Sequence, residues 1–364
     1  MKPYSKELSP LTEKPLKLID IRECYKITNI LNNNPNVGNN INIGIIVAYA
    51  YYPSNKNLIT DLTTYCKQYN IQFPDTNKIH IHEMYANNIS DYGWGLETAL
   101  DLQTIYTICP NLNIYIVQAK SSSYQDIMNA VEWASNNCNV VSMSLGSDEF
   151  AEMIQYEKYF KNTNVCYFAS SGDANSVSYP SSCCNICCVG GSSLQLKDDK
   201  TRLIESAWSN AGCGNSLYFK IPAYQKNNLI NAKTKIQIPT TRITPDLVCN
   251  ANPSCGVYIY FNNSYKIVGG TSLACPIISS FFSMVLSKRK LNKKPQLTTV
   301  YNGLNNNTNI QYLLYQIYNS PLYSKYYYDV TTGNDGRYKA ILNYDYATGL
   351  GVMLYDVVFN DMTV

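Results

Sequence analysis

Val268-Gly269-Gly270-Thr271-Ser272-Leu273-Ala274-Cys275-Pro276 is the stretch around which we expect the rest of the chain to be organised. Two glycines precede a Thr-Ser pair, and an apolar run over 276–286 follows. The pattern predicts a tight turn that leads into a helix beginning at or near Ser272. Free N–H groups of a first helical turn favour negative charge, so this turn suits a serine nucleophile and its oxyanion site. The alternative is that Thr271 and Ser272 only cap a core helix.

Length and composition describe a globular chain without a strong charge bias. Its 364 residues can bury a sizeable core, and 45% of them are hydrophobic. A net charge of +3 without a basic block gives no reason to expect a nucleic-acid or anionic-membrane partner. The longest apolar runs, such as 43–52, are too short to span a bilayer, and residues 1–6 lack the apolar segment of a signal peptide.

The 13 cysteines favour reduced, small core residues, because many lie in apolar, strand-like runs. Cys183, Cys184, Cys187 and Cys188 also suggest zinc. Neighbouring residues on a strand point to opposite faces, however, so four such side chains do not readily surround one metal ion. We therefore favour the core interpretation over a metal site or a disulfide.

Strand-like and helical patterns alternate along most of the chain. Strands are predicted over 41–50, 113–119, 139–145 and 165–169, and helices over 58–69, 93–109, 124–136 and 149–160. This predicts an α/β fold with a mainly parallel central sheet and helices on both faces. We expect a single domain over 1–364, comprising an N-terminal arm (1–40), a core (41–320) and a C-terminal region (321–364).

The carboxyl ends of two predicted strands carry glycine-bearing turns suited to binding a substrate. One turn contains Ser144, Leu145 and Gly146, and the other is Ser170-Ser171-Gly172-Asp173. For Ser144, Leu145 and Gly146 the alternative is a simple strand end, and we favour the role in binding substrate.

A serine nucleophile needs a base, and the usual one is histidine. The chain has only His80 and His82, which lie in the alternating segment 78–83 without any glycine. A solvated edge strand is the better interpretation of this segment. Two histidines alone do not make a metal site.

Glu97 and Asp101 are the better candidates for the base. They are four residues apart on a predicted helix, so both carboxyls face the same way. Two close carboxyls tend to share a proton, which raises one apparent pKa. Such a pair works as a base at acid pH, where a histidine is protonated. The alternative is a solvated helix face, but Trp94, Leu96 and their apolar neighbours leave little room for it.

Taken together, these motifs resemble the sedolisin family of serine-carboxyl peptidases over nearly the whole chain. The segment 270–276 resembles the family's nucleophile motif, Glu97-x-x-x-Asp101 its carboxyl pair, and Ser171-Gly172-Asp173 its oxyanion segment. Three further blocks match in the family's order. They are Tyr179-Pro180-Ser181-Ser182 followed by Val189-Gly190-Gly191, Glu205-x-x-Trp208 with Gly212, Phe219, Pro222 and Gln225, and Arg242-x-x-Pro245-Asp246.

The resemblance implies a subtilisin-like fold and an acid-acting peptidase with a peptide or protein substrate. Ser272 would attack the peptide carbonyl, Glu97 would take its proton, Asp101 would hold the shared proton, and a protonated Asp173 would donate to the oxyanion. Ser144, Leu145 and Gly146 would bind the substrate backbone. We expect a monomer. The chain starts almost where the family's mature domain would, so either its inhibitory pro-region was removed or the protein is made without one. In the second case, we expect the ionisation of these carboxyls at neutral pH to be the restraint.

The resemblance also implies one calcium ion in the C-terminal region. Its ligands would be the carboxylates of Asp329 and Asp345 and the carbonyls of Val330, Ile341 and Asn343, all of them oxygens, as a hard cation requires. Ile341 and Asn343 stand where the family has glycines. Asn tolerates a positive φ and Ile does not, so the loop departs from the pattern at Ile341.

Two other functions remain open at this stage. An ordinary subtilisin-type protease with Asp, His and Ser lacks its strand-end aspartate and helix-start histidine here. A non-catalytic relative that binds or supports other proteins is disfavoured because all four chemical positions are filled. The sequence does not separate an endopeptidase from a tripeptidyl-peptidase.

Overall fold

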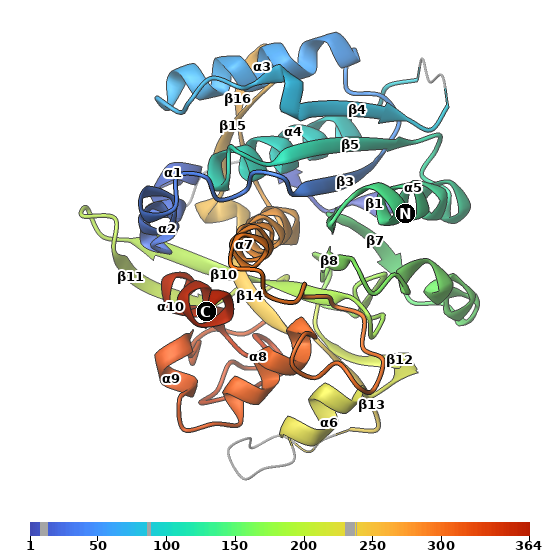
Figure 1. The fold of residues 1–364 in the computed structure, drawn as a ribbon, viewed down its shortest axis with the longest axis vertical. Coiled ribbons are helices and arrows are strands. Elements are labelled where there is room, and N and C mark those ends of the chain that lie inside the picture. Colours follow the sequence, from blue (N-terminus) through green and yellow to red (C-terminus); the bar gives the residue numbers. More distant parts are fainter. Residues whose placement is uncertain (8–13, 86–88, 230–236, 238) are drawn as a thin grey trace.

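The protein is built on a central, mainly parallel β-sheet (Figure 1). Its strands are β3 (Asn42–Ala48), β4 (Ile79–Glu83), β5 (Asn113–Ala119), β6 (Val140–Met143), β8 (Cys166–Ser170), β10 (Cys187–Leu196), β11 (Arg202–Ala207) and β14 (Leu247–Asn250). They follow the order β11-β10-β8-β6-β3-β5-β4, with β14 paired to β10. Only β10 and β11 pair in antiparallel fashion within this sheet, as far as the described residues show. The computed structural model describes residues 1–7, 14–85, 89–229, 237 and 239–364.

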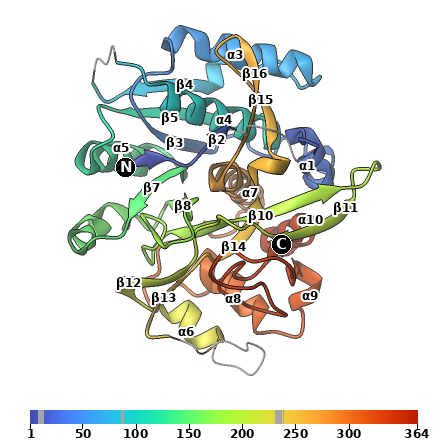
Figure 2. The same ribbon diagram turned by 180° about the vertical axis from the view of Figure 1, so that it is seen from behind.

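Helices cover both faces of this sheet, as expected (Figures 1 and 2). A Cβ added at Gly44 of β3 would lie 3.1 Å from Ala134 of a helix on one face. Residues at odd positions of β3 point to the other face, because side chains alternate along a strand. The helices are α1 (Leu18–Cys24), α2 (Ile27–Asn33), α3 (Asn55–Gln68), α4 (Tyr92–Ile108), α5 (Tyr124–Asn137), α6 (Ala223–Leu229), α7 (Thr271–Leu291), α8 (Ile310–Tyr318), α9 (Tyr323–Tyr326) and α10 (Tyr355–Thr363).

Short strands and 3₁₀ turns complete the fold around this sheet. β1 (Lys2–Pro3), β7 (Leu145–Asp148) and β9 (Ser178–Tyr179) form one small sheet, and β15 (Val257–Phe261), β16 (Ser264–Gly269) and β2 (Lys6–Glu7) form another. The remaining elements are β12 (Gly214–Lys220), β13 (Thr241–Thr244), β17 (Tyr327–Tyr328), β18 (Val352–Met353), η1 (Thr76–Lys78), η2 (Ala151–Phe160) and η3 (Pro253–Cys255). The helix predicted over 149–160 is therefore a 3₁₀ helix.

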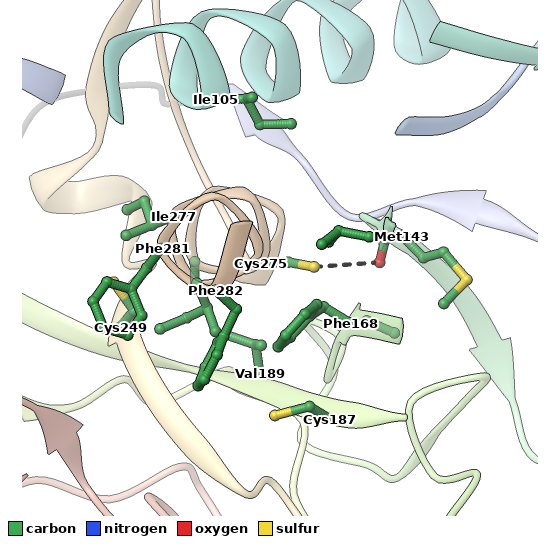
Figure 3. Close-up of a cluster of buried hydrophobic side chains, with 14 of the residues drawn as sticks. Ile105, Met143, Phe168, Cys187, Val189, Cys249, Cys275, Ile277, Phe281 and Phe282 are labelled. Carbon is green, nitrogen blue, oxygen red and sulfur yellow. Dashed lines mark hydrogen bonds between the residues drawn. The ribbon is translucent and has the colours of Figure 1, made fainter. Parts of the chain in front are cut away.

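Helix α7 runs through the centre of the molecule and is buried on all sides from Thr271 to Ser287. Figure 3 shows apolar side chains surrounding it, including Phe168, Val189 and Cys249 from neighbouring strands. Its 21 residues have the length and hydropathy of a membrane span, but 94% of its most apolar segment is buried inside the protein. Such a helix, apolar all round, is also what the core of a large protein requires.

All 13 cysteines are free thiols. Eleven are buried, and only Cys24 and Cys184 are partly exposed. No group of three or more possible metal-binding side chains (His, Cys, Asp or Glu) occurs among the described residues. The preference for reduced core residues over disulfides agrees with this structure.

A fully buried ion pair joins β13 to the loop that follows it. Arg242 donates from Nη1 to Asp246 Oδ1 (2.9 Å) and from Nη2 to Oδ2 (2.6 Å), and both side chains are completely buried. Asp246 also accepts from the backbone N–H of Cys188 in β10 (2.8 Å) and from the Tyr315 hydroxyl of α8 (2.9 Å). One carboxylate thus connects the central sheet, β13 and α8.

We expect Arg242→Met to lower the free energy of unfolding by about 3–5 kcal/mol, because it leaves Asp246 charged and buried without its cation. Urea unfolding at neutral pH measures this loss. Lys26→Met is the matched control, since the Lys26–Asp356 pair is 3.6 Å apart with 61% of the lysine side chain exposed, and its loss should cost below about 1 kcal/mol. Equal losses in the two variants would contradict the role given to the buried pair.

Candidate active site

The four side chains predicted to carry out the chemistry lie in one buried cluster. Glu97 and Asp101 come from α4, Asp173 follows β8, and Ser272 lies in the first turn of α7. Their exposed fractions are 1%, 0%, 6% and 0%, respectively. The cluster lies at the carboxyl ends of β6 and β8, where parallel sheets bind ligands.

The N-terminus of α7 is held by Asp173 and not by its own hydroxyls. Gly270 is the N-cap residue with φ +107°, and no side chain of the helix caps it. Instead, Thr271 donates from its backbone N–H (2.9 Å) and its hydroxyl (2.8 Å) to Asp173 Oδ1. The alternative in which Thr271 and Ser272 serve only as helix caps is therefore wrong.

Ser272 contacts both a carbonyl oxygen and a carboxyl. Its hydroxyl donates to the carbonyl oxygen of Ser144 (3.3 Å) and lies near enough to Glu97 to lower the pKa of that carboxyl. Pro276 has no N–H, so the Ser272 carbonyl lacks its usual partner four residues on. The Ser144 hydroxyl lies 3.3 Å from that carbonyl oxygen. The motif proline thus leaves an acceptor that ties α7 to the end of β6.

Glu97 and Asp101 are buried, and neither forms an ion pair within the described residues. Burial raises the pKa of Glu97 to about 8, opposed by hydrogen bonds from Ser272 and Ser5. Burial, followed by the charge of Glu97, raises the pKa of Asp101 well above its usual range, while the Ser144 hydroxyl donates to Asp101 Oδ1 at 2.7 Å. Glu97 Oε1 and Asp101 Oδ2 have no hydrogen-bond partner among the described residues. A proton held between the two carboxyls would satisfy both oxygens.

Asp173 has one occupied and one free oxygen. Its Oδ1 accepts from Thr271, whereas its buried Oδ2 has no partner in the described part of the chain. Burial raises the pKa of this carboxyl to about 6, and hydrogen bonds from Thr271 and the charges of Lys6 and Lys2 oppose the rise. In its protonated form, below about pH 6, Asp173 can donate a hydrogen bond from Oδ2.

The predicted substrate edge, formed by Ser144, Leu145 and Gly146, already carries an extended strand. Leu145 and Gly146 pair in antiparallel register with Pro3 and Lys2 of β1, and the N–H of Tyr4 lies 3.3 Å from the Ser144 carbonyl oxygen. Figure 1 shows the N-terminus beside β7. The sequence predicts an arm over residues 1–40 but does not predict that residues 1–7 enter the site. The segment is too short to show periodicity, and no motif in it signals a binding role.

Both histidines lie away from this cluster. His80 and His82 belong to β4, at the edge of the central sheet, as predicted. Their rings stack on Tyr115 and Trp133, respectively. An Asp-His-Ser arrangement of the ordinary subtilisin type is therefore absent from this chain, whose only two histidines are both described.

The predicted calcium ligands meet in one C-terminal loop. Asp329 Oδ2 accepts from the backbone N–H of Asn343 (2.8 Å), and Asp345 Oδ2 accepts from that of Ile341 (2.9 Å). Asn343 has φ +68°, whereas Ile341 is not among the residues with positive φ. The left-handed position is thus occupied by the residue that tolerates it. Val330 adjoins Asp329 and is buried. The oxygen-only set fits a hard cation, although both carboxylates accept hydrogen bonds from loop amides.

Comparison with known proteins gives a consistent family. A sequence model of the subtilase family matches residues 83–316. Xanthomonalisin from Xanthomonas sp. (strain T-22) is 32% identical over 149 residues, or 40% of this chain and 15% of that protein. Sedolisin from Pseudomonas sp. (strain 101) is 25% identical over 194 residues, covering 50% of this chain and 29% of that protein. Tripeptidyl-peptidase 1 from Dictyostelium discoideum is 25% identical over 299 residues, covering 72% of this chain and 46% of that protein.

The chain thus spans less than half the length of these three curated relatives. The structure of Pseudomonas sedolisin, a serine-carboxyl proteinase complexed with two molecules of pseudo-iodotyrostatin, superposes with a TM-score of 0.79 at 20% identity. The match covers 96% of this chain and 98% of that one, which establishes the subtilisin-like fold. The resemblance to sedolisins expected from the motifs is confirmed.

The raised pKa of Glu97 makes stability depend on pH in a defined direction. A carboxyl whose pKa is higher in the folded than in the unfolded protein makes its full contribution to folding stability below about pH 4. That contribution is lost as the pH rises through about 8. Glu97→Gln should therefore be more stable than the parent at pH 8, by up to a few kcal/mol, and match it near pH 4. Urea unfolding at the two pH values tests this. Glu132→Gln on exposed α5 surface is the control, and parallel pH curves for Glu97→Gln and the parent would contradict the expectation.

Proposed function

The chain belongs to the subtilase family, and we propose that it is an acid-acting serine-carboxyl peptidase. The observation that carries this proposal is the buried Ser272 hydroxyl, which lies close enough to Glu97 to lower the pKa of that carboxyl, in a cluster that contains neither histidine. A hydroxyl needs a base to become a nucleophile, and these carboxyls are the titratable partners that the fold provides. All four positions proposed for the chemistry carry a serine or a carboxyl side chain, which disfavours a non-catalytic relative.

In the proposed mechanism, Ser272 Oγ attacks the carbonyl carbon of the substrate peptide bond while Glu97 accepts its proton. Asp101 holds the proton shared with Glu97 and so keeps that carboxyl an acceptor. The protonated Oδ2 of Asp173 donates to the oxygen that becomes negative. Glu97 then returns the proton to the leaving nitrogen, and water releases the acyl group along the same path in reverse.

This mechanism predicts a loss of activity with rising pH. Asp173 carries its donating proton below its pKa of about 6 and loses it above, where an ionised carboxylate repels the oxyanion. The Oδ1 acceptor of Asp173 also holds Thr271. A substitution at this position therefore has to preserve the acceptor to separate chemistry from folding.

Asp173→Ala should lower kcat for a peptide substrate by ~10²–10³, the usual loss on removing one oxyanion donor. Asp173→Asn keeps an acceptor for Thr271 and supplies a donor that does not titrate. We expect this variant to retain activity as pH rises through about 6, where the parent declines. Profiles of kcat/KM from pH 3 to pH 8 give the comparison. Identical profiles for parent and Asn variant would refute the role of Asp173.

We also propose that the loop with Asp329 and Asp345 binds one calcium ion, which would supply a cross-link between two segments of the C-terminal region. Two carboxylates and the carbonyls of Val330, Ile341 and Asn343 make up the oxygen set. Support comes from the hydrogen bonds that bring both carboxyls to this loop, from the Asn343 N–H to Asp329 and from the Ile341 N–H to Asp345. Burial of Asp345, which raises its pKa to about 7, adds to it.

Saturating calcium should raise the Tm of the parent by a few degrees, because a ligand at 100 times its Kd stabilises by about 2.7 kcal/mol. Asp345→Asn keeps the Thr348 contact but removes the charge, so its Tm should not respond. Thermal melts in calcium and in chelator measure both. An equal shift in parent and variant, or none in either, would contradict this site.

A further inference from the structure

We propose that the Tyr4–Ser5 peptide bond is a substrate of the chain's own active site, and that a tyrosine pocket selects it. This inference rests on the proposed peptidase function. Residues 1–7 pass through the site as an extended segment. β1 pairs with β7 on one side, and on the other β2 pairs with β16, with Lys6 opposite Gly269 and Glu7 opposite Val268.

The two ends of this peptide bond face the groups that cleavage requires. The N–H of Ser5 donates to Glu97 Oε2 at 2.7 Å, which places the leaving nitrogen against the proposed proton carrier. The Tyr4 carbonyl oxygen lies beside Gly270. A Cβ added at Gly270 would collide with this oxygen and would lie 2.6 Å from Asp173 Oδ2. The carbonyl oxygen and the proposed oxyanion donor therefore border the same small space. Gly270 leaves that space open because it has no side chain.

The side chain of Tyr4 fills a pocket made for a phenol. Tyr4 is 6% exposed, and its hydroxyl hydrogen-bonds to Ser178 Oγ. Since the Ser178 hydroxyl donates to the Ser147 carbonyl (3.0 Å), it is the tyrosine that donates to Ser178. A Cβ at Gly146 would lie 2.7 Å from the Tyr4 hydroxyl oxygen, and one at Gly172 would lie 3.4 Å from it. Both glycines thus make room for the ring.

The reaction is an ordinary hydrolysis with one water consumed. Ser272 Oγ bonds to the Tyr4 carbonyl carbon and its proton passes to Glu97. The C–N bond then breaks, and Glu97 gives that proton to the nitrogen of Ser5. Water next attacks the acyl carbon and loses a proton to Glu97, which returns it to Ser272. The products are a segment ending in the Tyr4 carboxylate and a chain beginning with the amino group of Ser5.

This placement has two consequences for other substrates. With residues 1–7 in position, Ser272 and Glu97 are buried, so an external peptide reaches them only after the segment leaves. A substrate bound in the same pose would carry tyrosine on the acyl side of the cleaved bond.

The test follows the intact mass of the full chain after a shift from neutral pH to pH 4. We expect first-order loss of the segment up to Tyr4, at a rate independent of protein concentration, and a new N-terminus at Ser5 by sequencing. Ser272→Ala should stay intact. Tyr4→Phe should still be cleaved, and Tyr4→Gly, which empties the pocket, at least roughly tenfold more slowly. Equal rates for Tyr4→Gly and the parent would overturn the pocket's role.

Digestion of casein at pH 4 by the parent and by Tyr4→Gly separates this inference from the proposed function. The inference would be overturned, and the peptidase function would stand, if casein is digested in a Ser272-dependent way while the Tyr4–Ser5 bond stays intact or another bond of the chain is cleaved in its place. No Ser272-dependent cleavage of casein or of the chain, by either protein at any pH from 3 to 8, would overturn both. Ser178→Ala adds a specificity readout. It should reduce the preference for tyrosine over phenylalanine peptides roughly tenfold, because the phenol loses its buried partner.

Discussion

The hydrogen bonds from Thr271 to Asp173 are the constraint on which the site depends. They join the loop after β8 to the first turn of α7, a helix that is buried from Thr271 to Ser287. The same carboxyl thereby satisfies a helix N-terminus with one oxygen and leaves the other free. The helix N-terminus favours the charged form of Asp173, whereas burial favours the neutral form. The pKa of about 6 reflects the balance of these two effects.

Buried acidic groups without an ion-pair partner among the described residues are concentrated at this site. Asp246 is equally buried but is compensated by the bidentate contact with Arg242. Within the described residues, Glu97 and Asp101 have no such partner, and they accept hydrogen bonds from the backbone N–H of Ser5 and the Ser144 hydroxyl, respectively. A core with uncompensated carboxyls is expensive at neutral pH. The protein gives up stability at a place where two carboxyls of raised pKa lie near a serine hydroxyl.

Much of this arrangement was predictable because local patterns determine it. Asn113–Ala119 has the predicted strand bounds, since its apolar run is bordered by clear turns, and α4 and α7 begin within a residue or so of the predicted positions. The spacing of Glu97 and Asp101 placed both carboxyls on one helix face. Contacts that depend on distant segments were not predictable: the capping of α7 by Asp173, the Ser144–Ser272 contact, and the pairing of residues 2–3 with β7. The stretch 149–160 was wrongly predicted as an α-helix, because pattern alone does not distinguish the 3₁₀ form.

The unequal burial of the thirteen thiols gives the chain a built-in reporter of unfolding. Burial raises the pKa of both partly exposed thiols, Cys24 and Cys184, to about 11, and the other eleven are enclosed. A thiolate is the species that alkylating reagents attack, so the native protein should react slowly and at two positions at most. Mass increments from a brief alkylation pulse would then separate native molecules from opened ones, molecule by molecule, without any added label.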